Sequence, residues 1–283
     1  MTRRPKPSDD EILRALYALR DSPVVCEART FAAARPRRRG LVRPTTRWMA
    51  AAAVAAVGFA HFAPWPRPPE QMLGTRVGEV RSVRLEDGSR VILDTDTRLR
   101  MSVAGRTRRV ELLSGRAAFQ VAHDMSRPFR VAAGAMTVTA VGTAFEVMAL
   151  PRRTSVTLME GRVVINAEHP PKAGVRREAD LRPGEQLSLG ADGALSSRRP
   201  VSLDSALAWR ALRVDVSDLT VAEAVAEMNR YSKVKLAVRN PTVSSRRISG
   251  VFRAGDVEAL AAALAAYFEL RVVERSGGRI VLA

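Results

Sequence analysis

Apolar and polar residues alternate through the middle of the chain. From Val77 to Asn166 the side chains follow a period of two, the period of a β-strand that buries one face. Turn-forming residues interrupt the pattern at intervals, as in Asp87-Gly88 and Ser126-Arg127-Pro128. Many short strands separated by such turns are typical of an all-β sandwich or jelly-roll-like domain, which we place at residues 66–167.

The alternation predicts ten strands in this domain, with turns at Gly105, Gly115, Gly134 and Gly161. The expected bounds are Val77–Leu85, Arg90–Leu93, Arg98–Val103, Arg108–Leu113, Arg116–Val121, Phe129–Val131, Met136–Val141, Ala144–Leu150, Thr154–Glu160 and Arg162–Asn166.

The pattern changes near Trp209, after which short strands and two amphipathic helices follow one another. The expected elements are strands at Leu212–Val216, Val234–Val238, Ile248–Arg253, Leu270–Glu274 and Arg279–Leu282, and helices at Thr220–Tyr231 and Val257–Tyr267. Thr220 and Asp256 lie where each helix needs an N-cap. We therefore expect a small α+β domain at residues 209–283. Residues 168–208, rich in Pro, Gly, Arg and Glu, are expected to form a connector with one strand at Gln186–Leu189.

An uncharged apolar run, Trp48–Ala63, precedes the β-rich part. It follows a cluster of arginines and ends at a group of prolines, so it predicts a transmembrane helix over residues 48–65 whose N-terminus stays in the cytoplasm. The run is short for a hydrocarbon core of roughly 30 Å, so a cleaved signal peptide and a buried core helix remain alternatives. Arg38-Arg39 also fits a twin-arginine export signal.

The segment before this run, residues 1–47, holds one clear helix. Residues 8–20 carry acidic residues in the first turn and an apolar face that contains Leu13, Leu16, Tyr17 and Leu19. An isolated helix of this length is marginal in water, so its apolar face should pack on a partner protein, on the membrane surface or on a second helix. The segment has twelve basic and five acidic side chains, which favours contact with anionic lipid or an acidic protein surface.

Charge and composition exclude several classes of function. The net charge of +17 comes almost entirely from arginines spread along the whole chain, so we do not expect direct nucleic-acid binding. The single cysteine, Cys26, and the widely separated His61, His123 and His169 predict neither disulfides nor a structural zinc site. No nucleotide-binding glycine motif or nucleophile elbow occurs, and His123, Asp124 and Ser126 are interpreted as turn residues. We expect no cofactor and no enzyme of an ordinary catalytic class.

Several stretches of the chain match a known family in order and spacing. They are Gly78–Val91, Leu113–Val121, Arg127-Pro128-Phe129, Val141–Val147, Leu158–Val163, Ala208-Trp209-Arg210, Val225–Tyr231 and Ile248–Phe252. These stretches resemble the FecR family of transmembrane anti-sigma regulators over roughly residues 70 to 283.

The resemblance implies a single-pass inner-membrane regulator with its C-terminal part in the periplasm. Such a protein relays a signal from the signalling domain of a TonB-dependent outer-membrane transporter to an extracytoplasmic-function sigma factor, and periplasmic and intramembrane proteases release the cytoplasmic part. It would control transcription of uptake genes for iron complexes or similar nutrients. The alternative is a membrane-anchored periplasmic module that binds a secretin or transporter and has no sigma factor.

The roles that the resemblance implies can be assigned to particular residues. In the sigma-binding segment we expect Leu13, Leu16, Tyr17 and Leu19 to form the contact face, although the chain departs from the family here by having a short N-terminal region. The C-terminal domain is similar to the short N-terminal domain of secretins and transporters. Its expected receptor-binding residues are Trp209, Val214, Val216, Ile248, Val251 and Phe252.

Gly142-Thr143 is the one place where covalent chemistry is expected. Some members of the family are cut between a Gly and a Thr by their own folded domain. In that reaction the Thr hydroxyl attacks the preceding carbonyl, and Gly tolerates the strained backbone that the attack needs. The other interpretation of this pair is a β-bulge at which Gly permits close packing.

Overall fold

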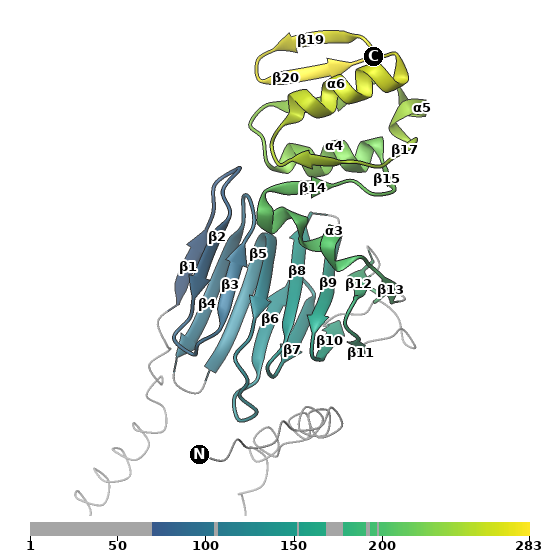
Figure 1. The fold of residues 1–283 in the computed structure, drawn as a ribbon. Helices are drawn as coiled ribbons and strands as arrows, with labels where there is room; N and C mark the ends of the chain where they lie inside the picture. The colour runs from purple at the N-terminus through teal and green to yellow at the C-terminus, as the bar shows by residue number, and fades with distance from the viewer. Residues whose placement is uncertain (1–69, 105–106, 152, 168–177, 191–192, 197) are drawn as a thin grey trace, which may run out of the picture.

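The structure, a computed structural model, describes residues 70–104, 107–151, 153–167, 178–190, 193–196 and 198–283. It consists of a β-rich domain followed by a smaller α+β module (Figure 1). The predicted membrane segment Trp48–Ala63 and the helix expected over residues 8–20 lie outside the described residues. Among the residues that are described, none belongs to a helix long and apolar enough to cross a membrane.

The described part of the β-rich domain contains thirteen strands, all joined by hydrogen bonds. They are β1 (Gln71–Gly74), β2 (Arg81–Arg84), β3 (Arg90–Leu93), β4 (Arg98–Ala104), β5 (Thr107–Gln120), β6 (Phe129–Ala133), β7 (Met136–Ala140), β8 (Ala144–Leu150), β9 (Arg153–Glu160), β10 (Val163–Ala167), β11 (Glu178–Leu181), β12 (Glu185–Leu189) and β13 (Arg199–Pro200). The prediction of an all-β domain built from short strands is confirmed.

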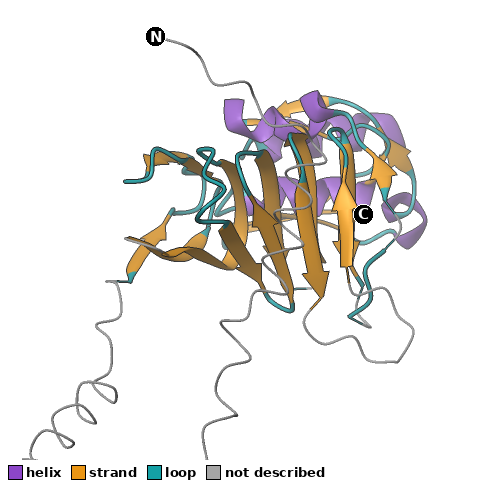
Figure 2. Cartoon of the chain, turned by 90° about the horizontal axis from the view of Figure 1, so that it is seen from below, coloured by secondary structure: helices purple, strands orange, loops and turns teal. Residues whose placement is uncertain are grey.

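The strands form two layers that share one long strand, β5 (Figure 2). The first half of β5 pairs with β4 and β6, in a layer that continues through β7, β10 and β11 and ends at β1 on the other side. The second half pairs with β3 and β8, in a layer that also contains β2, β9, β12 and β13. The chain therefore closes a sandwich around a single shared strand.

Gly115 lets β5 pass from one layer to the other. Val110 and Leu112 point into the core before it, and Ala117 and Phe119 do so after it, so the buried face changes phase at this point. Gly115 has a φ of +96°, and a Cβ there would lie 2.4 Å from the Thr97 Oγ1 atom. The turn predicted at Gly115 is wrong, because β5 is continuous and bends there instead of reversing.

The core between the layers is apolar and centred on three phenylalanines. Phe119 of β5 stacks on Phe145 of β8 with ring centroids 5.2 Å apart, and contacts Phe129 of β6 at 6.0 Å. All three rings are fully buried. Because Phe129 belongs to one layer and Phe145 to the other, Phe119 joins the two layers through direct ring contacts.

Part of the predicted connector belongs to this domain. β11 pairs with β10, and β12 pairs with β9, so residues 178–189 extend both layers. The strand expected at Gln186–Leu189 is confirmed, whereas the remaining strands of this region and β1 were not predicted. These strands are short and contain charged residues such as Glu178 and Arg199, so the alternation of apolar and polar residues is too brief to predict a strand.

The C-terminal module follows the predicted order of helices and strands. Its elements, with two short helices that lead into it, are α3 (Leu203–Leu207), η2 (Ala208–Ala211), β14 (Arg213–Asp215), β15 (Leu219–Thr220), α4 (Val221–Arg230), β16 (Lys235–Val238), α5 (Pro241–Ser244), β17 (Arg247–Ile248), β18 (Val251–Arg253), α6 (Val257–Phe268), β19 (Val272–Ser276) and β20 (Arg279–Leu282).

Local sequence explains both long helices of the module. Thr220 caps α4 in a capping box with Glu223, and Asp256 accepts a hydrogen bond from the Ala259 amide to cap α6. The buried faces of α4 and α6 pack on a small sheet in which β20 lies between β16 and β19. One surface of α4, however, faces the β-rich domain.

We predict that Gly115→Ala destabilises the fold more than Gly134→Ala does. Both glycines have a positive φ, but a Cβ at Gly115 would overlap Thr97, whereas a Cβ at Gly134 would meet nothing within 4 Å. The backbone penalty of about 1 kcal/mol is common to both variants, and overpacking adds about 1–3 kcal/mol only at Gly115. Urea unfolding followed by circular dichroism measures the difference. Equal losses would show that β5 does not need its bend.

Candidate functional site

The two parts of the molecule meet on the outer face of the layer that contains β3, β5 and β8 (Figure 1). Ala118 of β5 points away from the sandwich core and is buried in the same cluster as Trp209 and Met228. Ile92 of β3 packs against that cluster. This face of the β-rich domain is therefore covered by η2 and α4 instead of water.

Arg116, beside Ala118 on the bend of β5, lies at the centre of this contact. Its side chain is 8% exposed, and its Nη2 atom lies 2.8 Å from a carboxylate oxygen of Asp94 and 2.8 Å from one of Glu227. Its Nε atom also donates to Asp94 at 2.8 Å, and the guanidinium donates to the Tyr231 hydroxyl. Arg116 thus bridges a carboxylate of its own domain and one from α4.

A second guanidinium, from α4 of the C-terminal module, binds the same two carboxylates. Arg230 of α4 donates to Asp94 at 2.8 Å and to Glu227 at 3.0 Å, and the Tyr231 hydroxyl donates to Asp94 at 3.0 Å. The Thr95 hydroxyl donates to the backbone carbonyl of Arg230 at 3.1 Å. Two arginines and two carboxylates therefore alternate across the boundary, and their formal charges cancel.

The protonation states of the network reinforce one another. Burial alone would lower the pKa of Arg116, but the carboxylates of Glu227 and Asp94 raise it well above its usual range. Burial would raise the pKa of Glu227, yet Arg116 and Arg230 hold it below its usual range. Each charge is stable because its partners are charged.

Trp209 fixes the start of the module to the same face. Its indole Nε1 donates to a carboxylate oxygen of Glu146 on β8 at 2.6 Å, and the Arg116 guanidinium lies 5.1 Å from the ring centroid. Trp209 is 2% exposed, and burial raises the pKa of Glu146. This tryptophan is therefore buried against the β-rich domain and does not lie on the outer surface as an exposed receptor contact.

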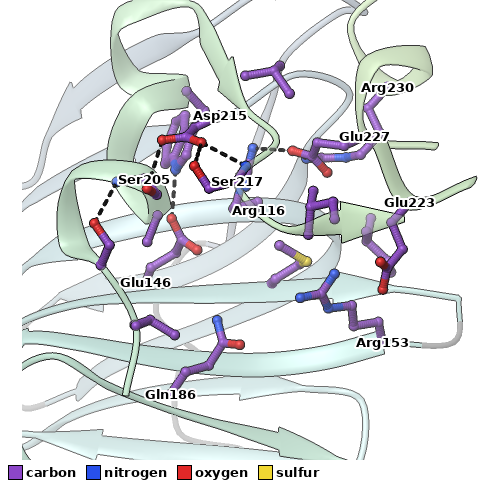
Figure 3. A pocket seen from close by; sticks show the side chains of 18 of the residues that line it. Arg116, Glu146, Arg153, Gln186, Ser205, Asp215, Ser217, Glu223, Glu227 and Arg230 are labelled. Carbon is purple, nitrogen blue, oxygen red and sulfur yellow. Dashed lines mark hydrogen bonds and ion pairs between the residues drawn. The ribbon is translucent and has the colours of Figure 1, made fainter. Parts of the chain in front are cut away.

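A cleft of about 620 Å³ opens beside this network (Figure 3). It lies between β8, β9 and β12 on one side and α3, β14 and α4 on the other, and Arg153, Arg199 and Arg213 contribute to its lining. Asp215 accepts hydrogen bonds from the Ser205 hydroxyl at 2.7 Å and the Ser217 amide at 2.9 Å. Within the described ranges, no cluster of His, Cys, Asp and Glu could hold a metal ion.

Gly142 and Thr143 lie between β7 and β8, at the edge of the sandwich. Gly142 has a φ of +107°, and a Cβ there would lie 2.5 Å from the Nδ1 atom of His123. The Thr143 hydroxyl is buried and has no hydrogen-bond partner. The only register shift of β8 falls later, between Ala144 and Phe145, so Gly142 lies outside a strand bulge.

The neighbouring turn holds no Ser-His-Asp triad. The Asp124 carboxylate accepts hydrogen bonds from the Ser126 hydroxyl at 2.7 Å and from Arg127 at 2.7 Å. These interactions, led by the hydrogen bond from Ser126, lower the pKa of Asp124 to about 2. The Ser126 hydroxyl is thus a donor to the carboxylate and is not activated by His123.

The expected receptor-binding residues do not form one surface. Trp209, Val214 and Val216 are buried, and Ile248 and Phe252 pack partly against the module core. Val251, at 59% exposure, is the member of the set that reaches the surface fully. The expected sigma-binding residues Leu13, Leu16, Tyr17 and Leu19 lie outside the described residues.

Sequence reasoning missed the charged network. One signal was present, because β5 and β8 carry apolar or small residues on both faces, such as Ala117 and Ala118, which is typical of strands covered on both sides. A charged residue within such strands, here Arg116 or Glu146, needs a buried partner. The partners from the C-terminal module are distant in sequence, since Glu227 lies 111 residues from Arg116 and Trp209 lies 63 residues from Glu146, so they have no local signature.

We predict that Arg116→Met lowers the free energy of unfolding by about 3–5 kcal/mol, because it leaves the Asp94 and Glu227 carboxylates with one guanidinium fewer in a buried site. The matched control is Arg275→Met, which breaks an ion pair with Glu258 whose side chains are 62% and 55% exposed. That change should cost at most about 1 kcal/mol. Urea unfolding measures both. The double variant Arg116→Met with Glu227→Gln should recover part of the loss, and similar values for Arg116→Met and Arg275→Met would contradict the prediction.

Two crystal structures of a candidate anti-sigma factor from Parabacteroides distasonis superpose with TM-scores of 0.63 and 0.64. In each case the identity is 22% and 98% of that chain is covered, together with 76% and 75% of this chain. Coverage of this extent includes more than the β-rich domain, so the likeness in fold extends into the C-terminal module. No curated protein matches the chain.

A family comparison agrees with the resemblance found in the sequence. The model of the FecR protein family matches residues 71–164, which run from β1 into β10 and include Arg116, Gly142, Thr143 and Glu146. The β-rich domain of this chain therefore matches the FecR family over most of its length, and it is called the FecR domain below.

Proposed function

We propose that the protein is an anti-sigma regulator that relays a periplasmic signal to an extracytoplasmic-function sigma factor. The observation that supports this most is a FecR domain whose outer face is clamped to a second module by a buried charge network. A chain that only had to bind one partner would not need its two modules to be coupled in this way. The candidate anti-sigma factors that share the fold support the same role.

The C-terminal module is the proposed receiver of the signal. Its strand β19 lies at the edge of the small sheet, on the side away from the FecR domain (Figure 1). Val272 and Val273 on this strand are 47% and 50% exposed, and Tyr267 at the end of α6 is 78% exposed. An edge strand with apolar side chains is suited to strand addition by a partner domain. In this proposal the partner is the signalling domain of a TonB-dependent outer-membrane transporter.

The network explains how binding at the module could reach the FecR domain. A partner that displaces α4 would separate Glu227 and Arg230 from Arg116 and Asp94. The ion pairs that hold the C-terminal module on the FecR domain would then be broken. Proteases then act on the altered periplasmic part, and the cytoplasmic segment leaves the inner membrane with its sigma factor.

The first test is a pull-down from the native cell with residues 1–47 as bait. We expect an extracytoplasmic-function sigma factor among the bound proteins, and Leu16→Asp should reduce its recovery more than tenfold because it places a charge on the expected apolar contact face. Ala18→Ser is the control on the same predicted helix. Recovery of a transporter or secretin by the full chain without any sigma factor would replace the proposal by the periplasmic binding module.

A second activity is supported by the geometry at Gly142 and Thr143. We propose that the FecR domain cuts its own chain between these residues once, through attack of the Thr143 hydroxyl on the Gly142 carbonyl carbon. The support is a nucleophile that is buried without a hydrogen-bond partner, next to a glycine with a φ of +107°. Glycine adopts this backbone conformation without a steric penalty, so the peptide can be held in a geometry that other residues would resist.

We predict that the full chain, expressed with a tag at each end, yields a fragment whose N-terminus is Thr143. Thr143→Ala should stay intact, because the nucleophile is lost, and Thr143→Ser should still be cut. Thr139→Ala on β7 serves as the control for loss of a threonine nearby. Immunoblots of both tags and mass spectrometry of the new N-terminus measure the outcome, and an uncut wild-type chain would contradict the prediction.

A further inference from the structure

The imidazole of His123 packs directly on the backbone of Gly142. A Cβ at Gly142 would lie 2.5 Å from His123 Nδ1, 2.9 Å from its Cβ and 3.0 Å from its Cα. Separations of this size leave no room for any side chain at residue 142. The glycine is thus required both by its φ and by the ring that lies on it.

The Thr143 residue is held from three sides while its hydroxyl remains unused. The Val121 amide donates to the Thr143 carbonyl at 2.9 Å. A Cβ at Gly161 would lie 2.8 Å from the Thr143 Cγ2 atom and 3.3 Å from the Gly142 carbonyl oxygen. The main chain and the methyl group are therefore fixed, whereas Oγ1 has no hydrogen-bond partner.

Because Val121 is two residues before His123, the same segment that holds Thr143 also places the imidazole. Asp124, the next residue, is bound to Ser126 and Arg127, which fixes the turn without involving the ring. His123 is exposed on its other side. The ring is therefore open to water on one side, while its Nδ1 atom lies against Gly142 at the place that a side chain would occupy.

We propose that His123 is the proton-transfer residue of this self-cleavage. The inference rests on the self-cleavage proposed above and names the group that performs its proton transfers. The imidazole takes the hydroxyl proton as Thr143 Oγ1 bonds to the Gly142 carbonyl carbon. It returns that proton to the Thr143 nitrogen as the carbon–nitrogen bond breaks, which leaves an ester and a free amine. Water then hydrolyses the ester to a Gly142 carboxylate and the free Thr143 hydroxyl.

The test compares cleavage rates of the full chain in pulse-labelled cells and after purification of the uncut precursor. His123→Ala and His123→Gln should slow the appearance of the Thr143 fragment by about 10²-fold or more. Free imidazole added to purified His123→Ala precursor should restore part of the rate, which a purely structural defect would not allow. Ser126→Ala, in the same turn, is the matched control and should be cut at the wild-type rate.

Each outcome decides between the two proposals. If the wild type is cut, Thr143→Ala is not, and both His123 variants are cut at the wild-type rate, the role of His123 is overturned and self-cleavage stands. If imidazole fails to rescue His123→Ala and both variants also unfold at a lower temperature, His123 is a packing residue and the inference is wrong. If the wild type is never cut, both proposals fall.

Discussion

A guanidinium buried away from water needs carboxylates beside it, and for Arg116 these come from both parts of the molecule. Asp94 can meet this need from within the FecR domain, but Glu227 can do so only if α4 lies on the outer face of the sheet. The position of the C-terminal module is therefore set by a charge requirement as much as by apolar packing. Trp209 and Glu146 extend the same condition to the segment that joins the two parts.

The chemistry of this contact suits a signalling protein. Two arginines and two carboxylates that neutralise one another while buried can each be solvated by water when the surfaces part. An apolar interface of the same area would resist opening much more strongly, because separation would expose its whole surface to water. The buried ion pairs therefore hold the C-terminal module in one position on the FecR domain and still allow the two to separate. The proposed relay function requires this property, whereas a rigid two-domain scaffold would not.

Much of the fold could be read from the sequence. Period-two alternation located most strands of the FecR domain, and capping residues such as Thr220 and Asp256 located both long helices of the module. The sequence around Gly115 predicts a turn where β5 in fact bends, because a glycine between two apolar stretches is compatible with either. The site was harder to find. No local sequence pattern marks the four charged residues of the network, because their ion pairs join elements that are far apart in the sequence. These residues are Asp94, Arg116, Glu227 and Arg230.

The residues expected to bind a receptor illustrate the same limit. Val214 and Val216 follow the alternation of a β-strand. Alternation shows which face is apolar, but not whether that face packs on a partner or is buried inside the same protein, as it is here. The pair Gly142-Thr143 differs, because the chemistry expected of it depends on two adjacent residues, and that chemistry stays a prediction. The ring of His123, nineteen positions earlier in the chain, again had to come from the structure.

The bend of β5 has a mechanical consequence. Arg116, which holds the module, follows Gly115 directly, and the first half of the same strand pairs with β4, which in turn pairs with β1. β1 begins at Gln71, close to where the chain leaves the predicted membrane segment. Only two strand pairings thus separate the clamp from the stalk that would anchor the domain. A force applied to the C-terminal module would pass through Arg116 to β5, and from β5 through the backbone hydrogen bonds of β4 to β1, which lies next to the predicted membrane segment in the sequence.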